Sequence, residues 1–333
     1  MYKDILFLEG VKQSTRQNVL NFVQSWNSKD DYILVNTSGS TGAPKQIKLL
    51  KSRMKASANA TVKFFELKPG QTILMALSSE YIAGKMLIVR AIENNLKLII
   101  APLSSNPLLT PLHYKIHFSA FVPLQVQTII ANKKSKANYE LIDKVIIGGG
   151  EINQSLEKNI LALNNSNFAT FGMTETISHI ALRNISKGEQ YYTALPNVKF
   201  SINTNSCLII NAPSIHSEIN LQTTDNVDLL NNKQFIWKGR ADFVINSGGI
   251  KLHPEALERK IQSLLPNNRY YFKGEKDNLL GEKLVLKIES DSNLNLQELK
   301  EQIKLIVDKI EVPKSIILIP KFIETKTGKI IRN

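Results

Sequence analysis

The sequence predicts an α/β fold with a largely parallel sheet, from the order of its apolar segments and the places of its glycines. Short apolar runs typical of buried strands alternate with longer stretches of helical periodicity. This alternation is typical of β–α–β units. Glycine-rich segments directly follow two of the expected strands, and parallel sheets bind ligands beyond the carboxyl ends of their strands. The expected strands are 32–35, 46–50, 72–77, 97–101, 116–122 and 144–147.

The expected helices lie between these strands. In the first, 14–28, Val19, Phe22, Val23 and Trp26 fall on or near one face, and Ser14 with Gln17 suits a capping box. The second ends at Lys68-Pro69-Gly70, a clear stop signal. The remaining expected helices are 52–67, 82–94, 123–132 and 154–163.

A second, smaller α+β unit is expected near the C-terminus. The chain of 333 residues is longer than one ordinary core sustains. We expect a large domain over 1–241 and a small domain over 242–333. The small domain is predicted to contain helices at 255–265 and 296–309 and strands at 284–288 and 315–319.

The composition, with 43% hydrophobic and 21% charged residues, is that of a globular protein. The net charge of +13 is spread along the chain, densest at 133–136, and favours a solvated face or the steering of anionic small molecules. No zinc-ligand spacing or RNA-binding aromatic pattern accompanies it, so we expect no nucleic-acid partner. We expect no membrane span, secretory signal or internal disulfide (Cys207 is the only cysteine), and a cytoplasmic location.

The segment 37–45 has the chemistry of a polyphosphate-binding loop. Its glycines allow backbone N–H groups to approach a ligand, its hydroxyls donate hydrogen bonds, and Lys45 supplies a positive charge. A Walker A loop is excluded because the glycines are three apart and no Ser or Thr follows Lys45. The alternative for the isolated segment is an ordinary Ser/Gly hairpin loop.

Further polar segments follow in a fixed order along the chain. They are Gly148-Gly149-Gly150-Glu151, Phe171-Gly172-Met173-Thr174-Glu175, Thr223-Thr224-Asp225, Gly239-Arg240-Ala241-Asp242, Gly248-Gly249 and Thr327-Gly328-Lys329. Together with 37–45, they resemble the motifs of the adenylate-forming superfamily, which includes acyl-CoA synthetases and peptide-synthetase adenylation domains. The resemblance covers the chain from about Asp31 to its end. Two positions depart from it, with Phe171 in place of the usual tyrosine and Thr224 in place of the usual glycine.

The resemblance implies a role for each matched residue. Thr174, Glu175 and Lys329 would be catalytic, with Glu175 also binding Mg²⁺, and Asp242 would be the hinge of a mobile small domain. ATP would be bound by Thr37, Ser38, Gly39, Ser40, Thr41, Gly42, Lys45, Gly149, Gly150, Glu151, Phe171, Gly172, Asp225 and Arg240.

The implied reaction is ATP-dependent activation of a carboxylic acid, followed by thioester formation with coenzyme A. The segments 172–179 and 81–86 are most similar to the o-succinylbenzoate–CoA ligases of menaquinone synthesis, with Tyr81 in place of a histidine. A second substrate carboxylate would need a cation from Lys85, Arg90 or His179. The expected acyl- and CoA-binding residues are Tyr81, Lys85, His179, Gly248 and Gly249.

Three alternatives stay open at this point. One is another aryl- or fatty-acyl-CoA ligase, and a second is a stand-alone adenylation domain that loads a carrier protein. The third, a catalytically inactive nucleotide-binding module, is disfavoured because the matched catalytic positions are occupied. Because the family usually carries a substantial subdomain before the loop at 37, the resemblance also implies either a thinner large domain or a homodimer that covers the exposed surface.

Overall fold

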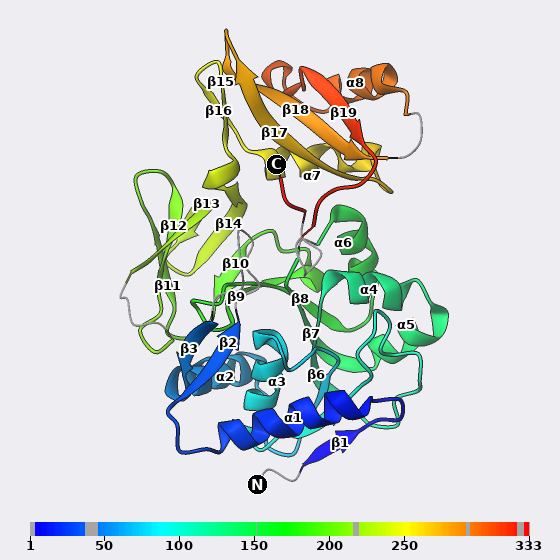
Figure 1. Cartoon of the computed structure of the whole chain (residues 1–333), viewed down its shortest axis with the longest axis vertical. Coiled ribbons are helices and arrows are strands. Elements are labelled where there is room, and N and C mark those ends of the chain that lie inside the picture. The colour runs from blue at the N-terminus through cyan, green and yellow to red at the C-terminus, as the bar shows by residue number, and fades with distance from the viewer. Residues whose placement is uncertain are drawn as a thin grey trace.

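The computed structural model describes residues 4–36, 46–150, 152–215, 220–290, 294–324 and 330–332. Its elements form a 12-stranded sheet, a five-stranded sheet and a two-stranded hairpin. Figure 1 shows the large sheet with its helices in the lower part of the molecule and the five-stranded sheet at the top. We call the parts built on these two sheets the large unit and the small unit.

The first half of the large sheet is parallel, in the order β1-β5-β4-β6-β7-β8. Its strands are β1 (Ile5–Phe7), β4 (Thr72–Met75), β5 (Lys97–Ile100), β6 (Ile116–Phe121), β7 (Ile142–Ile147) and β8 (Ser166–Gly172). Four of the strands predicted from apolar runs lie here, namely 72–77, 97–101, 116–122 and 144–147, whereas 32–35 and 46–50 form the separate hairpin. The α/β class of the fold is confirmed.

The second half of the sheet is antiparallel, in the order β8-β9-β10-β14-β13-β12-β11. The added strands are β9 (His179–Asn184), β10 (Tyr192–Ala194), β11 (Lys199–Ile202), β12 (Cys207–Asn211), β13 (Leu221–Asn231) and β14 (Gln234–Arg240). A parallel neighbour requires a long crossover, and the short connections from β8 through β10 and from β11 through β14 allow only a direct return of the chain. The expectation of a largely parallel sheet is therefore correct only as far as β8.

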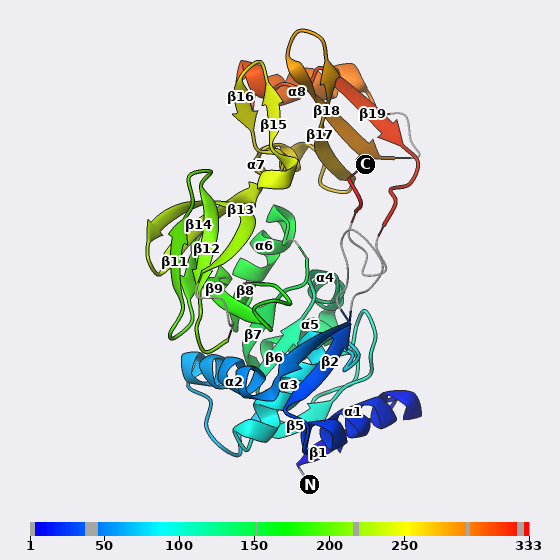
Figure 2. The same cartoon turned by 60° about the vertical axis from the view of Figure 1, so that its left-hand side comes forward.

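Helices cover both faces of the parallel half (Figure 2). On one side lie α1 (Gln13–Trp26), α2 (Lys51–Phe65) and α3 (Ile82–Glu93), and on the other α4 (Pro123–Ile130), α5 (Lys133–Glu140) and α6 (Gln154–Leu161). Alternate residues of β4 enter the two cores: Ile73 and Met75 pack on the first side and Leu74 on the second. This is the period of two expected of a strand buried on both faces.

Two local predictions about helices differ from the structure. The capping box at Ser14 does not form, because α1 begins at Gln13 after Lys12, and the Gln17 amide donates to Asn21 instead. The basic cluster at 133–136 lies on α5, which the apolar periodicity did not reveal. The Asn132 side chain accepts from the backbone N–H groups of Lys134 and Ser135 and caps this helix.

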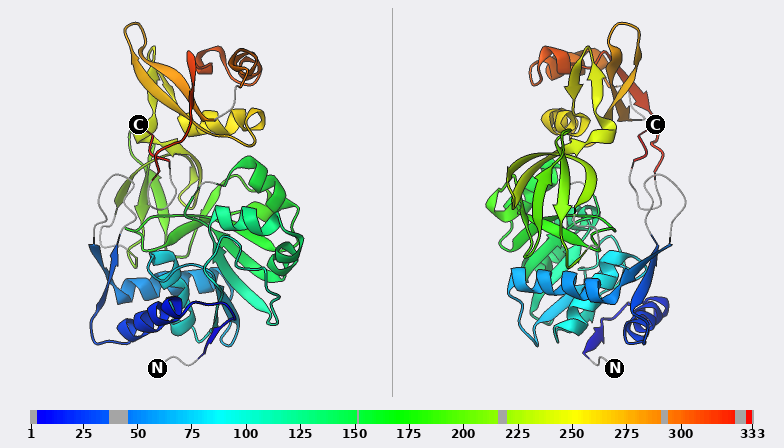
Figure 3. Two further views of the ribbon diagram at one scale, coloured as in Figure 1. Left: turned by 45° about the vertical axis from the view of Figure 1, so that its right-hand side comes forward. Right: turned by 90° about the vertical axis from the view of Figure 1, so that its left-hand side faces the viewer.

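The small unit pairs its strands in the order β16-β15-β18-β17, with β19 parallel to β18. Its elements are β15 (Ile245–Ser247), β16 (Ile250–Leu252), α7 (Pro254–Ile261), β17 (Arg269–Asp277), β18 (Gly281–Glu289), α8 (Leu296–Lys304) and β19 (Ser315–Ile319). Leu257 and Ile261 of α7 share a core with Leu299 and Ile303 of α8. Figure 3 shows this unit stacked above the β11–β14 end of the large sheet.

The remaining elements are a hairpin and four 3-10 turns. The hairpin pairs β2 (Tyr32–Asn36) with β3 (Gln46–Leu50), so the predicted phosphate-binding loop connects two paired strands. The 3-10 turns are η1 (Ile185–Lys187), η2 (Ala241–Phe243), η3 (Gln262–Leu264) and η4 (Lys309–Glu311). Across the ranges described above, no helix has the length and apolar character needed to cross a bilayer.

Candidate functional site

The glycines after β7 lie where that strand meets β8. A Cβ atom at Gly148 would lie 2.1 Å from Oγ1 of Thr170, so any larger residue here would have to displace the Thr170 side chain on the neighbouring strand. Gly149 has a φ of +86°, a conformation that glycine adopts without strain. Because β7 and β8 are parallel, this turn and the end of β8 at Gly172 lie at the same edge of the sheet. Glu151, the last residue of this motif, lies outside the described residues.

The chain leaves β8 through a tight turn that carries Thr174 and Glu175. The hydroxyl of Thr176 accepts from the backbone N–H of Met173 at 2.9 Å and lies 2.9 Å from the Ser178 carbonyl, to which it donates. Thr176 is fully buried, whereas Thr174 is half-buried and Glu175 exposed. The turn thus presents both predicted catalytic side chains from a fixed base.

Sequence reasoning missed this role of Thr176 and the strain beside it. Ile177 has a φ of +66°, a left-handed conformation that is costly for a β-branched residue. Its backbone N–H donates to the Thr174 carbonyl at 2.9 Å. The only available signal was a second hydroxyl residue, Thr176, directly after Thr174-Glu175, because Thr side chains often hydrogen-bond to nearby backbone in turns.

The exposure of Glu175 fits the metal role implied for it. Mg²⁺ is usually held by one or two carboxylates together with water and substrate phosphates, so one exposed carboxylate is a sufficient protein ligand. Within the described residues, no group of three or more His, Cys, Asp and Glu side chains forms a metal site.

Asp225 and Arg240 lie opposite each other on β13 and β14. The indole N–H of Trp237 donates to Oδ1 of Asp225 at 2.9 Å, a contact that sequence reasoning missed. Burial raises the pKa of Asp225 above its ordinary 3.8, although this hydrogen bond and the Arg240 charge oppose that shift. The Arg240 guanidinium donates to Asp242 at 2.5 Å, so the predicted hinge residue pairs directly with a predicted ligand-binding residue.

Phe171 belongs to an aromatic cluster that joins β8 to β14. Its ring centroid lies 5.0 Å from that of Phe235 and 5.8 Å from that of Tyr192, and Tyr192 stacks on Phe235 at 5.5 Å. The Arg183 guanidinium lies 5.9 Å from the Tyr192 ring centroid and also forms a bidentate pair with Glu157, at 2.6 and 2.8 Å. Phe171 remains half-buried, so the cluster fixes its ring without enclosing it.

A buried polar cluster forms where α2 and α3 meet the segment after Glu175. Arg90 of α3 is 2% exposed, and its Nη2 donates to Oγ of Ser178 at 3.2 Å. Oγ of Ser178 lies 2.7 Å from Oγ of Ser57, and Nε2 of His179 lies 3.2 Å from Oγ1 of Thr61.

The charge of Arg90 has no acidic partner among the ion pairs of the described residues, and its Nε has no hydrogen-bond partner there. Burial lowers its pKa to about 9, which still leaves it charged at neutral pH. Burial and the Arg90 charge hold the pKa of His179 well below its ordinary 6.5, so His179 is neutral. Of Arg90 and His179, it is therefore Arg90 that carries a positive charge at neutral pH and could pair with a second substrate carboxylate.

Lys85 and Tyr81 lie at the start of α3. Nζ of Lys85 donates to the backbone carbonyls of Ser79 at 2.5 Å and Glu80 at 3.1 Å, and lies 5.4 Å from the ring centroid of Phe22. Burial lowers its pKa. Lys85 also lines a hollow of about 600 Å³ between α1 and the β2–β3 hairpin. Tyr81 is half exposed.

The predicted residues of the small unit are only partly described. Gly248 and Gly249 form the β15–β16 turn with φ of +59° and +82°, which explains the two glycines. Lys329 lies outside the described residues, as do Thr37, Ser38, Gly39, Ser40, Thr41, Gly42 and Lys45.

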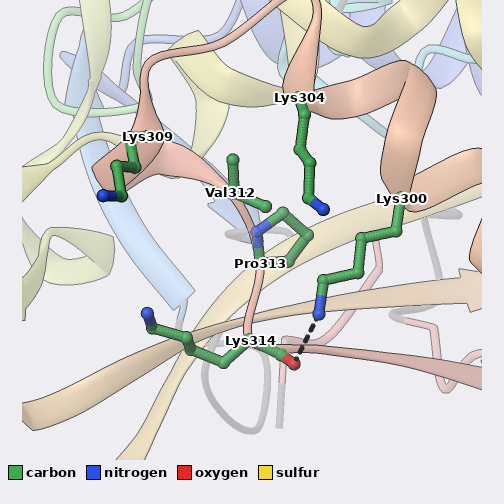
Figure 4. A pocket seen from close by; sticks show the side chains of 6 residues that line it. All are labelled: Lys300, Lys304, Lys309, Val312, Pro313 and Lys314. Atoms are coloured by element: carbon green, nitrogen blue, oxygen red, sulfur yellow. Dashed lines mark hydrogen bonds between the residues drawn. The ribbon is translucent and has the colours of Figure 1, made fainter.

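A second hollow, of about 400 Å³, lies on the small unit (Figure 4). It contains none of the motif residues. Figure 4 shows the side chains of four lysines around Val312 and Pro313, and Nζ of Lys300 donates to the carbonyl of Lys314 at 3.2 Å. The lining residues are Lys300, Lys304, Lys309, Val312, Pro313 and Lys314.

Several of the described motif residues lie on the same large sheet, on strands β7 and β8 and on strands β13 and β14. Gly149, Phe171, Arg240 and Asp225 lie on or directly after strands of this one sheet, whereas Gly248 and Gly249 lie in the small unit. A family model described as AMP-binding enzyme matches residues 3–213. The chain belongs to this family. The resemblance to adenylate-forming enzymes is thereby confirmed, and the general class is an AMP-forming ligase.

Named relatives of this AMP-binding enzyme include two curated proteins called 2-succinylbenzoate--CoA ligase. The protein from Lactococcus lactis subsp. lactis (strain IL1403) is 23% identical over 320 residues, which cover 90% of this chain and 69% of that protein. The protein from Staphylococcus aureus (strain MRSA252) is 24% identical over 352 residues, covering 97% and 70%. The chain thus spans about 70% of their length.

Solved structures similar to this AMP-binding enzyme show the same fold. An acyl-CoA synthetase (AMP-forming)/AMP-acid ligase II-like protein from Dyadobacter fermentans is 33% identical, with a TM-score of 0.67 and coverage of 98% of this chain and 94% of that one. The O-succinylbenzoate coenzyme A synthetase from Bacillus subtilis, in complex with ATP and magnesium ion, has a TM-score of 0.78 at 18% identity. It covers 90% of this chain and 68% of that one.

Proposed function

We propose that this AMP-binding enzyme activates a dicarboxylic aryl acid with ATP and transfers the acyl group to coenzyme A, with o-succinylbenzoate as its substrate. The observation that carries the substrate class is the buried Arg90 beside the turn that carries Thr174 and Glu175. The names of the curated relatives support the same acid. The resemblance associates this reaction with menaquinone biosynthesis, and we propose the cytoplasm, which supplies ATP and coenzyme A, as its place.

In the first step, a carboxylate oxygen of the acid attacks the α-phosphorus of ATP and the bond to pyrophosphate breaks. Negative charge grows on the α-phosphate oxygens, so oriented donors lower the barrier. The Thr174 hydroxyl and the Lys329 ammonium would donate to these oxygens, and Asp225 would accept from the ribose hydroxyls. Residues 37–45 would hold the β- and γ-phosphates. When bound through Glu175, Mg²⁺ supplies countercharge to the triphosphate.

In the second step, the coenzyme A thiolate attacks the acyl carbonyl carbon, and the bond to AMP breaks. Lys329 must leave the site before the thiol enters. A rotation of the small unit about Asp242 would achieve this and would bring the glycines of the β15–β16 turn against the pantetheine arm. This rotation follows from the family resemblance.

The electrostatics of Arg90 support a substrate that has a second carboxylate group. A buried charge without a counter-ion is costly, and a ligand carboxylate removes that cost when it binds. Nη2 of Arg90 contacts Ser178, three residues after Glu175, so a carboxylate paired with Arg90 would lie beside the turn that carries the predicted catalytic residues. Lys85 is a weaker candidate because two backbone carbonyls already accept from its ammonium.

Pyrophosphate release across a panel of acids tests this proposal. We expect release with o-succinylbenzoate and much less with 4-oxo-4-phenylbutanoate, which lacks only the ring carboxylate. With coenzyme A, the thioester and AMP should form in equal amounts, whereas a carrier-protein thiol should not replace it. Equal rates for the two acids would contradict the role of Arg90. Fatty acids as the best substrates, or acylation of a carrier protein alone, would favour the alternatives.

A further inference from the structure

We propose that Arg259 is a positioning residue that couples the placement of the small unit to nucleotide binding by Asp225, through Trp237. This inference rests on the proposed role of Asp225 in holding the ribose. It adds a contact between the two units that no sequence motif assigns.

The first observation is that Arg259 bridges the two units. It lies on α7, which both Figures 1 and 2 show between β17 and the end of the large sheet at β13 and β14. Its guanidinium carbon lies 5.4 Å from the centroid of the Trp237 ring on β14, and its Nη2 donates to the Lys238 carbonyl at 3.1 Å. A cation above an indole face is the strongest of the cation–π arrangements.

The second observation is that Trp237 holds the candidate ribose ligand. Its indole N–H donates to Oδ1 of Asp225, which orients the carboxylate and leaves Oδ2 for a ribose hydroxyl. One indole ring therefore contacts the small unit with its face and the nucleotide site with its edge. A shift of the ring that follows the loss of Arg259 would reorient the Asp225 carboxylate.

These contacts belong to one placement of the small unit. Two other hydrogen bonds cross the same junction, from the Arg240 N–H to Glu255 at 3.3 Å and from the Gln154 N–H to Gln262 at 2.6 Å. A rotation about Asp242 would separate Arg259 from Trp237. Linkage is reciprocal, so a nucleotide that binds the oriented Asp225 must favour the placement in which Arg259 lies on Trp237.

The experiment uses Trp237 as its own reporter. The chain has two tryptophans, and Trp26 lies in α1 with its N–H bonded to Glu93, so Trp26→Phe leaves a single emitter at the junction. In this background, ATP with Mg²⁺ should shift the Trp237 emission and reduce its quenching by acrylamide. Arg259→Gln should abolish this protection and weaken ATP binding about tenfold, within the range of one cation–π contact and one hydrogen bond.

Three controls separate positioning from folding and from charge. Lys260→Gln changes the neighbouring residue, whose ammonium pairs with Glu311 inside the small unit at 2.7 Å, and should leave both readouts unchanged. Arg259→Lys keeps the charge but loses the planar guanidinium, and should resemble Arg259→Gln. Both Arg259 variants should slow ATP–pyrophosphate exchange while converting supplied acyl-adenylate to thioester at the unchanged rate.

The outcomes are distinguishable from those that test the proposed function. Unchanged Trp237 quenching and ATP affinity in Trp26→Phe/Arg259→Gln would overturn the coupling. An equal loss in both half-reactions would also overturn it, because that pattern indicates a general structural defect. If ATP binds but no acid releases pyrophosphate, the proposed function fails, while the fluorescence measurement still tests the coupling.

Discussion

At the scale of single residues, the most informative side chain is Arg90, a buried cation without a carboxylate partner in the described part of the chain. Arg90→Gln should raise the KM for o-succinylbenzoate about 10- to 100-fold, the range for a lost hydrogen bond to a charged group. The KM for 4-oxo-4-phenylbutanoate should change little. Steady-state kinetics with both acids measures the difference.

Stability measurements separate this role from a structural one. Because removal of an unpaired buried charge relieves a desolvation cost, Arg90→Met should unfold at the same or a higher urea concentration than the parent chain. A large loss of stability, together with equal losses for both acids, would show that Arg90 serves packing and not substrate binding.

The buried carboxylate of Asp225 makes a prediction about pH. Burial raises its pKa above 3.8, so the folded chain takes up a proton there at a higher pH than the unfolded chain does. As pH falls through the raised pKa, protonation of Asp225 therefore favours the folded state over the unfolded state. The protonated, neutral carboxyl group accepts hydrogen bonds from ribose hydroxyls less well than the carboxylate does. ATP affinity should decline on the acid side, above the ordinary range of an aspartate. Calorimetric titration from pH 7 downward measures it, and Asp225→Asn should show weak binding without this acid limb.

At the scale of elements, Gly239 determines how closely α7 approaches β14. It has a φ of +151°, and a Cβ atom there would lie 2.6 Å from the buried Oε2 of Glu255. Gly239→Ala should destabilise the chain by about 1–3 kcal/mol through backbone strain and this collision. Urea unfolding measures the loss, and Glu255→Ala in the same chain should recover the part that comes from the collision. No recovery would indicate that backbone strain alone accounts for the effect.

The elements that the sequence predicted are those with a clear apolar period. The strand 315–319 has its predicted ends, and β4 to β7 lie within a few residues of theirs. The helix α5 was missed because KKSKANYE buries only Ser135 and Tyr139. The antiparallel strands were missed because a segment such as 221–231 is largely polar and gains its order from neighbouring strands.

The candidate site was likewise only partly predicted from the sequence. Thr174, Glu175, Asp225 and Arg240 were predicted because each belongs to a short motif that can be read locally in the sequence. The contacts that support these residues were not predicted, because the partners lie apart in the sequence. Arg90 and Ser178 are 88 positions apart, and Trp237 and Asp225 are 12 positions apart. Such pairs depend on which elements pack together, and no local pattern records that.

At the scale of the whole molecule, the two units make a prediction about the two half-reactions. Lys329→Ala should lower ATP–pyrophosphate exchange at least about 100-fold, the scale for loss of one oriented charge in the transition state. ATP binding and the conversion of supplied acyl-adenylate to thioester should persist. Single-turnover assays of each half-reaction measure this, and unchanged exchange would refute the catalytic role of Lys329.

The reversal of strand direction after β8 has a consequence for protein engineering. The long connection between two parallel strands could be lengthened without moving the strands. Here β8 pairs directly with the next strand, β9. The chain is also closely packed at this turn, since a Cβ atom at Gly172 would lie 2.4 Å from the Ser178 carbonyl oxygen. An insertion between these positions would have no free backbone to absorb it. Libraries that alter loop length in this enzyme should therefore yield active clones at the tip of the β17–β18 hairpin and none between Gly172 and His179.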